Sequence, residues 1–433
     1  MSRSEALGIL VTKESNLKLS SDYYKAIYHL SKFPGEDTNK ALISLLRSNS
    51  GNQSILIAKR KAVEVLALHK CYEAIPLIYS LLASDDIYLQ ENVILALEKL
   101  EFRDPIFEEK LCSLLHTNNL NRRIVIKALA SIGSKPCLQN ITGVIANPHS
   151  KPIDKGAAIA ATYALTGKSD HLFELEDNLF SLNQNERHCA VQDIIDAKLI
   201  AFIPCLLKSP IAPSFKIRAI NLLWPGEELL IDQIAIIEIL DSIIIDDFNN
   251  IKVVHEYEDQ PKISFLLDEL FSPDFSRCYL AMKAISSRKS LEIAPHLKNK
   301  FSLLEKDYGA LYFANKLFIT FNDWSQSILD KIENTALNCL DTKWPDQMKF
   351  KPAAIMTLIK FFPIKYKSKF AEWLDPRKTS YWVTRYALLM SIDSNYQRLP
   401  KKYISKLLDM GKIDINRFVR MKSESLSRKI CLE

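Results

Sequence analysis

Apolar residues along much of the chain recur at the spacing of one face of a helix. In residues 58–68, Ala62, Val65 and Leu66 fall on one stripe, and most of the charged side chains lie off it. Pro76 in the next segment suits a first helical turn, and apolar residues then return at the same spacing. The pattern predicts two helices packed against each other through these stripes.

This pair of helices is repeated along the chain. An Ala-Leu pair recurs near the end of a predicted helix at intervals of about 30 to 36 residues, which is typical of stacked helical hairpins. The pairs are Ala67-Leu68, Ala96-Leu97, Ala128-Leu129 and Ala164-Leu165. We therefore predict an all-α fold, a HEAT-like α-solenoid forming a curved superhelix with a concave binding cavity. Function in such a fold depends on what the concave face binds.

The repeat is clear as far as Leu207 and harder to follow after Pro225. Residues 231–245 form a long apolar stretch, and residues 246–259 are polar, as expected of a longer loop or a short helix. Helical periodicity returns from Ile263 onward. The sequence predicts a solenoid with no break in its stacking.

We divide this solenoid into residues 1–290 and a C-terminal continuation, residues 291–433, with a basic surface. Residues 343–433 hold 20 Lys and Arg against 8 Asp and Glu, a net charge of +12, whereas the whole chain carries +6. The residues before 343 therefore carry −6. This asymmetry predicts an acidic partner or an anionic ligand for the C-terminal part.

Composition argues against several other classes of protein. The chain has only 10 glycines and neither GxxxxGK[ST] nor GxGxxG, so no nucleotide site is expected. Its eight cysteines are scattered without a CxxC pair, and we expect reduced thiols, no metal site and no cofactor. No apolar run approaches the roughly 18 residues that span a bilayer. A cytoplasmic protein without a membrane span is expected.

Three segments resemble a known family. They are AKRKAVEVLALHKCYEAIPLIYSLLASDDIYLQENVILALEKL (58–100), residues 122–133, and RHCAVQDIIDA (187–197). They are similar to the HEAT-repeat phycobilin lyases of cyanobacteria (E/F type), most of all to the phycoerythrin alpha-subunit type. The resemblance covers roughly the first 290 residues well and the rest loosely.

The resemblance implies attachment of a linear tetrapyrrole, phycoerythrobilin, through a thioether to a cysteine of a phycoerythrin alpha subunit. The bilin is then the substrate. Because that type includes both plain lyases and lyase-isomerases, conversion to phycourobilin stays open. The YCRGN-like or histidine-cysteine motif of some relatives is not visible here, so no catalytic pair can be carried over.

Adding a thiol to a bilin requires the pyrrole rings to be held in place and protonated. Asp193 and Asp196 are three residues apart, hence on one helix face, and are candidates for the contacts with the pyrrole N–H groups. Arg187 and His188 precede them and can meet a propionate or donate a proton. The alternative for all four is an ordinary structural or solvated side chain.

Other candidates come from aromatic and basic residues. Tyr308 and Tyr312, four apart, can stack on a tetrapyrrole or donate a proton, or can belong to the core. Arg122 and Arg123 can bind propionates or an acidic acceptor subunit, or form a solvated face. Trp382 lies in an aromatic and cationic cluster that suits a planar anion, but a capping helix with its aromatic residues packed inward explains it equally well.

Three other functions compete with this one. A non-catalytic interaction scaffold or bilin chaperone needs no inward carboxylates. An iron-dependent hydroxylase built on HEAT repeats requires several His-Glu pairs, and only His255-Glu256 occurs. A DNA glycosylase requires a basic groove, but the chain before residue 343 is net acidic, so no nucleic-acid partner is expected.

Overall fold

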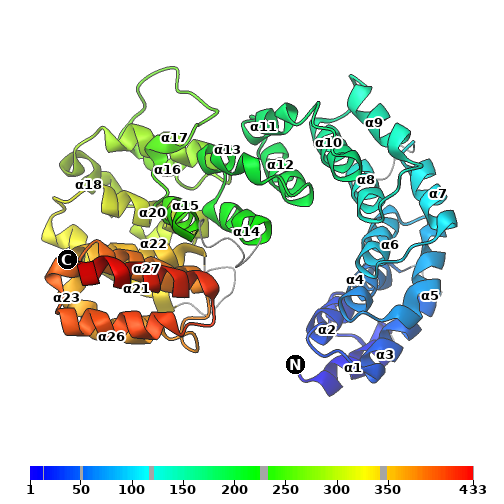
Figure 1. Cartoon of the computed structure of the whole chain (residues 1–433). Coiled ribbons are helices and arrows are strands. Elements are labelled where there is room, and N and C mark those ends of the chain that lie inside the picture. Colours follow the sequence, from blue (N-terminus) through cyan, green and yellow to red (C-terminus); the bar gives the residue numbers. More distant parts are fainter. Residues whose placement is uncertain (13, 49–51, 117–120, 225–232, 342–348, 433) are drawn as a thin grey trace. The chain divides into compact units, whose positions relative to one another are not determined.

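The computed structural model describes residues 1–12, 14–48, 52–116, 121–224, 233–341 and 349–432, and within these ranges it contains helices and no strand (Figure 1). The all-α prediction is confirmed. The packing divides the chain into two compact units, residues 1–175 and 176–433. The division that the sequence suggested at residue 290 lies inside the second unit.

The first unit consists of helical hairpins stacked in two layers. Its helices are α1 (Arg3–Val11), α2 (Asp22–Leu30), α3 (Glu36–Arg47), α4 (Gln53–Leu68), α5 (Ile75–Ser80), α6 (Ile87–Lys99), α7 (Pro105–Leu114), α8 (Arg122–Ser131), α9 (Leu138–Ala146) and α10 (Pro152–Thr166). The even-numbered helices pack on one another in succession from α2 to α10, and α3, α5, α7 and α9 each cover the helix that follows. Each apolar stripe is therefore buried between neighbouring helices.

Left-handed residues end several of these helices. Lys70, Glu101 and Gly133 have φ angles of 55°, 53° and 75° and recur every 31 or 32 residues. The amide after each of them bonds back across the helix end, as from Phe102 N to Leu97 O at 2.9 Å. A left-handed helix end usually takes glycine. Lysine and glutamate hold two of these three positions, so the chain needs few glycines.

These helix ends correct the register of the repeat. The carbonyl that accepts the closing bond belongs to Leu66, Leu97 and Leu129 in successive repeats. The pairs Ala96-Leu97 and Ala128-Leu129 are therefore equivalent, but Ala67-Leu68 is shifted, and Leu68 is 47% exposed. The spacing of the Ala-Leu pairs therefore located the helix ends of the repeat to within two residues.

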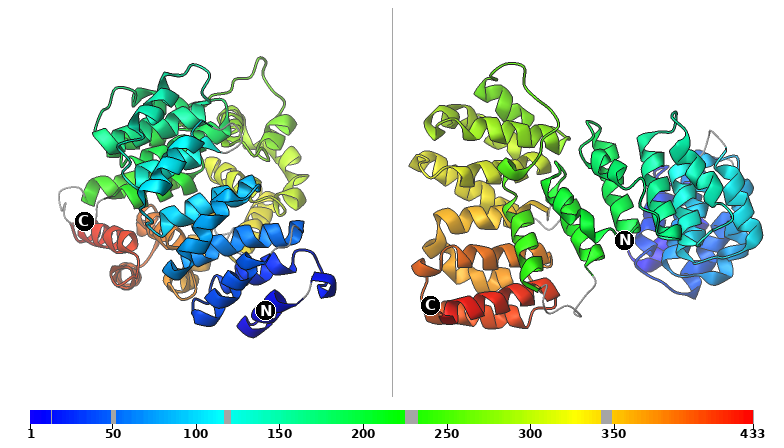
Figure 2. Two further views of the ribbon diagram at one scale, coloured as in Figure 1. Left: turned by 90° about the vertical axis from the view of Figure 1, so that its right-hand side faces the viewer. Right: turned by 45° about the horizontal axis from the view of Figure 1, so that its top comes forward.

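The second unit continues with α11 (Phe173–Leu179), which begins in the first unit, and then with further hairpins. Its helices are α12 (Gln184–Asp196), α13 (Ile203–Lys208), α14 (Pro213–Leu223), α15 (Gln233–Ile245), α16 (Ile263–Glu269), α17 (Phe275–Ser286), α18 (Ser290–Lys298), α19 (Phe301–Leu304), α20 (Tyr308–Thr320), α21 (Gln326–Asp341), α22 (Lys351–Phe361), α23 (Pro363–Tyr366), α24 (Phe370–Leu374), α25 (Trp382–Asp393), α26 (Lys401–Lys412) and α27 (Arg417–Leu432). The right-hand view of Figure 2 shows them in successive levels from α17 to α27.

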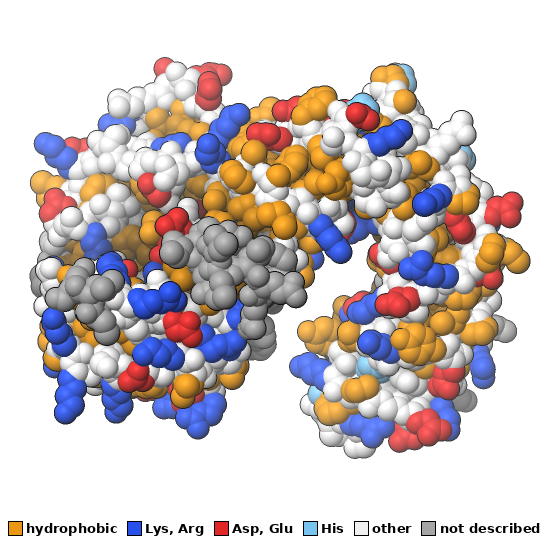
Figure 3. Space-filling model, in the orientation of Figure 1, with side chains coloured by type: hydrophobic (Ala, Val, Ile, Leu, Met, Phe, Trp, Pro, Cys, Tyr) orange, Lys and Arg blue, Asp and Glu red, His pale blue; other side chains and the backbone are white. Residues whose placement is uncertain are grey.

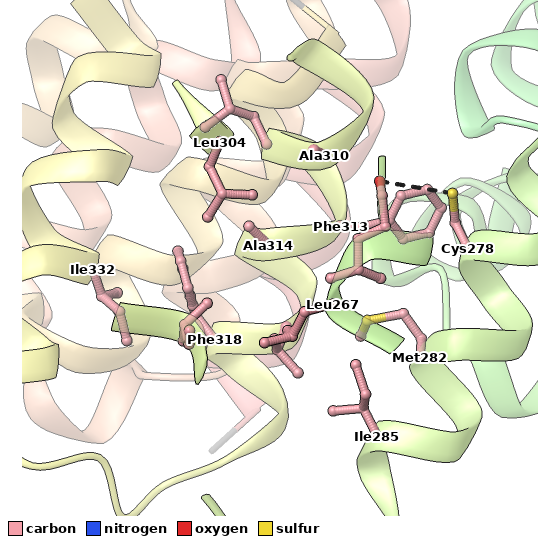
Figure 4. Close-up of a cluster of buried hydrophobic side chains, with 14 of the residues drawn as sticks. Leu267, Cys278, Met282, Ile285, Leu304, Ala310, Phe313, Ala314, Phe318 and Ile332 are labelled. Carbon is pink, nitrogen blue, oxygen red and sulfur yellow. Dashed lines mark hydrogen bonds between the residues drawn. The ribbon is translucent and has the colours of Figure 1, made fainter. Parts of the chain in front are cut away.

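The core of the second unit joins three of these levels. Cys278 and Met282 of α17 face Phe313 and Phe318 of α20, and Ile332 of α21 lies beyond them (Figure 4). All five side chains are at most 1% exposed. The apolar stretch expected at 231–245 is helix α15 from residue 233, and its first two residues lie outside the described part. The polar stretch after it contains a short 3₁₀ turn, Phe248–Asn250.

Part of the C-terminal positive charge is internal. Arg385 is fully buried and pairs with Asp414 at 2.7 Å, and Lys422 pairs with Asp241 at 2.6 Å. The Arg385–Asp414 pair is neutral within residues 343–433, whereas Lys422 is balanced by Asp241 outside that segment, so this second pair lowers the excess positive charge by one. Figure 3 nevertheless shows Lys and Arg side chains over the α23–α26 end of this unit.

Cys112 on α7 and Cys137 before α9 form a disulfide, with their Cα atoms 5.8 Å apart. The expectation that every cysteine is a reduced thiol is wrong for this pair, because the hairpin stacking brings together two residues 25 apart in sequence. Among the other described cysteines, Cys71, Cys278 and Cys339 are buried thiols. Burial raises the pKa of the Cys278 thiol well above its usual value.

Two features are absent from the described residues. No helix there is long and apolar enough to cross a membrane. Those residues also contain no group of His, Cys, Asp and Glu that could hold a metal ion.

Truncating a stripe residue should destabilise the first unit strongly. Leu97 is fully buried on α6, and Leu97→Ala should lower the free energy of unfolding by about 2–5 kcal/mol, because neighbouring repeats share one core. Leu95→Ala is the matched control, since Leu95 lies on the same helix but is 42% exposed. Denaturant unfolding of both variants measures the difference. Equal losses would contradict the assigned stripe.

Candidate functional site

A pocket in the second unit is formed by the first turns of α14, α17 and α20 and by the residues just before α22. Its volume is about 320 Å³, at the lower end of the range of roughly 300–1,000 Å³ for small-molecule pockets. The lining residues are Ala212, Pro213, Ser214, Phe215, Phe275, Tyr308, Gly309, Tyr312, Lys349 and Phe350. Figure 3 shows hydrophobic side chains gathered over α12 to α14, and the first turn of α14 forms one wall of the pocket.

Five of these ten lining residues are aromatic. Phe275 stacks on Tyr312 with ring centres 6.2 Å apart and planes 28° apart. Tyr308 lies 6.2 Å from Phe350, and its side chain is 47% exposed. The structure thus brings the two predicted tyrosines to one site, whose flat apolar faces suit a conjugated planar ligand.

His188 joins this site from α12. Its ring stacks on Phe215 with centres 4.3 Å apart and planes 14° apart. Burial lowers the pKa of His188, the neighbouring Arg187 lowers it further, and Asp274 opposes both effects. The His188 imidazole is therefore neutral at pH 7 behind one pocket wall, which does not favour the predicted role as a proton donor.

A buried polar cluster lies behind Tyr312. The Asp246 carboxylate, 4% exposed, accepts hydrogen bonds from the Tyr312 hydroxyl at 2.5 Å and from the Tyr279 hydroxyl at 2.8 and 3.0 Å. Burial and the nearby Asp246 charge raise the pKa values of both tyrosines well above the usual range. Both phenols therefore stay protonated and act as donors.

Two buried lysines accompany Asp246. Lys216 directly follows Phe215 on α14 and donates to the Leu207 carbonyl at 2.8 Å. Lys316, one turn after Tyr312, donates to the carbonyls of Ile244 and Ile245 at the end of α15. Burial lowers the pKa of each lysine to about 8, and attraction to Asp246 partly offsets this. Both remain mostly charged at pH 7.

The lowered pKa of Lys216 predicts a pH-dependent stability. Between about pH 8 and 10.5 the folded protein has released a proton that the unfolded chain still binds, so stability rises with pH. Relative to Lys216→Met, the wild type should gain up to about 3 kcal/mol of unfolding free energy over that interval. Lys306→Met, at an exposed lysine, is the control. Parallel curves for wild type and Lys216→Met would show that Lys216 does not titrate there.

The charges at the pocket are mixed. Helix N-termini carry partial positive charge, and Lys349, an exposed side chain, adds a full one. The carboxylates of Asp274 and Asp307 cap α17 and α20 and offset part of this field. Among the described residues, the site thus combines five aromatic side chains with Lys349 as a cation at its edge.

Arg187 is not among the residues that line the pocket. It is fully buried, and its guanidinium pairs with Asp274 and donates to the Ser181 and Leu182 carbonyls at 2.7 and 3.2 Å. The proposed contact with a propionate is therefore not supported, because these groups lie inside the protein. Arg385 binds carbonyls five and six residues before it in the same way, which indicates a structural motif.

The two carboxylates of α12 have different surroundings. Asp193 is 1% exposed, whereas Asp196 is exposed and accepts from Gln192 Nε2 at 2.6 Å. Neither is among the residues that line the pocket. Their three-residue spacing thus does not give a common ligand surface, and their contact with pyrrole N–H groups stays a prediction.

The remaining candidates lie elsewhere. Arg122 donates to Leu115 O and Arg123 to Ile153 O, each at 3.0 Å, in the first unit. Arg122 also lines a separate pocket of about 440 Å³ there. Trp382 packs on Phe418 of α27 with ring centres 5.2 Å apart. The inward-packed alternative therefore describes Trp382 better than a ligand contact.

Sequence reasoning missed Phe215, Phe275, Tyr279, Asp246 and Lys349. One signal was available, because Phe275 and Tyr279 on α17 have the same four-residue spacing as Tyr308 and Tyr312 on α20. Two helices carrying the same aromatic pair are candidates for facing walls. Asp246 gave no such local signal.

Comparison with known proteins identifies the family. The chain is 36% identical over 406 residues to the bilin biosynthesis protein CpeY of Synechococcus sp. (strain WH8020), which covers 93% of this chain and 96% of that protein. It is 28% identical over 405 residues to the uncharacterized phycocyanin operon protein Y of Pseudanabaena tenuis (strain PCC 7409), with 91% and 92% covered. No family model matches the chain.

Among solved structures, the complex of CpcE and CpcF of phycocyanin lyase from Nostoc sp. PCC7120 aligns with 56% of this chain and 95% of its own, at 23% identity and a TM-score of 0.47. The match to CpeY extends over nearly the whole length of both proteins. The chain belongs to the HEAT-repeat phycobilin lyase family of the E/F type.

Proposed function

We propose that this chain is a bilin lyase that attaches phycoerythrobilin through a thioether to a cysteine of a phycoerythrin alpha subunit. Its family and its likeness to a bilin biosynthesis protein support this activity. The structural observation that carries the proposal is the aromatic pocket of the second unit, which suits a flat conjugated ring system.

In this proposal the rings around the pocket hold part of the tetrapyrrole, and Lys349 pairs with a propionate. The acceptor thiol then adds to the exocyclic double bond of the bilin. A sulfur–carbon bond forms, the double bond breaks, and the bilin gains a proton as the thiol loses one. We assign the proton donor to Tyr308, because its side chain is the more exposed of the two tyrosines.

Co-expression with a phycoerythrobilin-making pathway and separate alpha and beta subunits tests the proposal. The expected result is pigment that stays on the alpha subunit after denaturation. An unshifted absorption band means attachment alone, and a band shifted to the blue means isomerisation to phycourobilin as well. Pigment that is never covalently bound would overturn the lyase and favour a chaperone or scaffold.

Asp196→Ala in the same assay tests the carboxylates of α12, and wild-type attachment would remove Asp196 from the site.

A further inference from the structure

Asp246 carries a buried carboxylate behind the pocket. It directly follows the last residue of α15, and its left-handed φ of 44° ends that helix as Lys70 and Glu101 end others. Its carboxylate is almost fully buried. The hydroxyls of Tyr279 and Tyr312 donate to this carboxylate, and Lys216 and Lys316 are attracted to its charge.

The two tyrosines bind the same carboxylate but differ in where their rings lie. Tyr279 is 1% exposed and packs at right angles to Phe313, with ring centres 5.2 Å apart. The Tyr312 ring lines the pocket. Its hydroxyl donates a hydrogen bond to Asp246. A ligand in the pocket therefore contacts the aromatic ring of Tyr312 and not its hydroxyl.

We propose that Asp246 is a positioning residue, which acts through the Tyr312 hydroxyl to fix the Tyr312 ring as a bilin-stacking wall of the pocket. This inference rests on the proposed function, since it concerns the same pocket. A phenylalanine at position 312 keeps the ring but has no hydroxyl for Asp246 to hold. Bilin binding then becomes weaker and less ordered, while the chemistry of attachment is unchanged.

The test compares purified full-length variants for phycoerythrobilin affinity, for the visible circular dichroism induced in the bound bilin, and for attachment to the alpha subunit. Tyr312→Phe and Asp246→Asn should each weaken binding about tenfold, because a ring that is no longer fixed must be ordered when the bilin binds. Both should reduce the induced dichroism and raise KM with little change in kcat. Tyr279→Phe is the matched control, because it removes the same type of bond to the same carboxylate. It should lower thermal stability but leave affinity within about twofold.

A double-mutant cycle gives the decisive result. If Asp246 acts through Tyr312, Asp246→Asn has no further effect on affinity in a Tyr312→Phe background. Additive effects, or equal loss of affinity in Tyr279→Phe, would show that the cluster only supports the fold and would overturn the inference. Wild-type affinity in both Tyr312→Phe and Asp246→Asn would do the same. If the wild-type protein itself binds no bilin, the result contradicts the proposed function and not the role of Asp246 within it.

Discussion

Ser214→Trp should abolish bilin attachment without unfolding the protein. Ser214 lies in the first turn of α14, lines the aromatic pocket and is only partly buried. An indole at this position occupies space in a pocket of about 320 Å³ and excludes a second flat ring. The rate of attachment should fall about 100-fold or more, equivalent to about 3 kcal/mol of lost transition-state binding.

The control for Ser214→Trp is Leu222→Trp. Leu222 is on the same helix, is 54% exposed and is not among the pocket residues. Co-expression followed by denaturation and measurement of covalent pigment compares the two. Normal attachment by Ser214→Trp, with its fold retained by circular dichroism, would exclude this pocket as the bilin site.

Asp274→Ala should cause the largest loss of stability in the second unit. Its carboxylate pairs with the fully buried Arg187, meets His255 Nε2 at 3.2 Å and accepts from the Ser276 amide at 2.8 Å. Removing it leaves a buried guanidinium without its counter-charge and α17 without its cap. The free energy of unfolding should fall by about 3–5 kcal/mol.

Asp268→Ala is the matched control for that loss. Asp268 also forms an ion pair, with Lys300, but its side chain is 58% exposed. An exposed pair contributes less than about 1 kcal/mol. Denaturant titrations of the two variants should therefore differ clearly. Similar losses would contradict a structural role specific to Arg187 and Asp274.

The sequence predicted the structural features that depend on residues close together in the chain. A helix stripe is visible within one turn or two, so the all-helical fold and its repeat could be predicted from residues such as Ala62 and Leu66. Tyr308 and Tyr312 were found for the same reason, since residues four apart share a helix face. These local patterns were sufficient for the repeat and for one wall of the pocket.

The other features depend on residues far apart in the chain. Asp246 meets Tyr279 and Tyr312 across 33 and 66 residues, and Arg187 meets Asp274 across 87. A basic residue next to an apolar stripe can face a ligand or a buried carboxylate, and only the tertiary packing decides between them. Arg187 pairs with Asp274 and Trp382 packs on Phe418, and neither partner is close in the sequence.

The central claim is that the bilin lies among the aromatic rings of the second unit. A crystal structure of the full chain with phycoerythrobilin tests it most directly. We predict tetrapyrrole density against Phe215, Tyr308 and Tyr312, with a propionate near Lys349. Density located instead at Arg122 in the first unit, with this pocket empty, would contradict the claim.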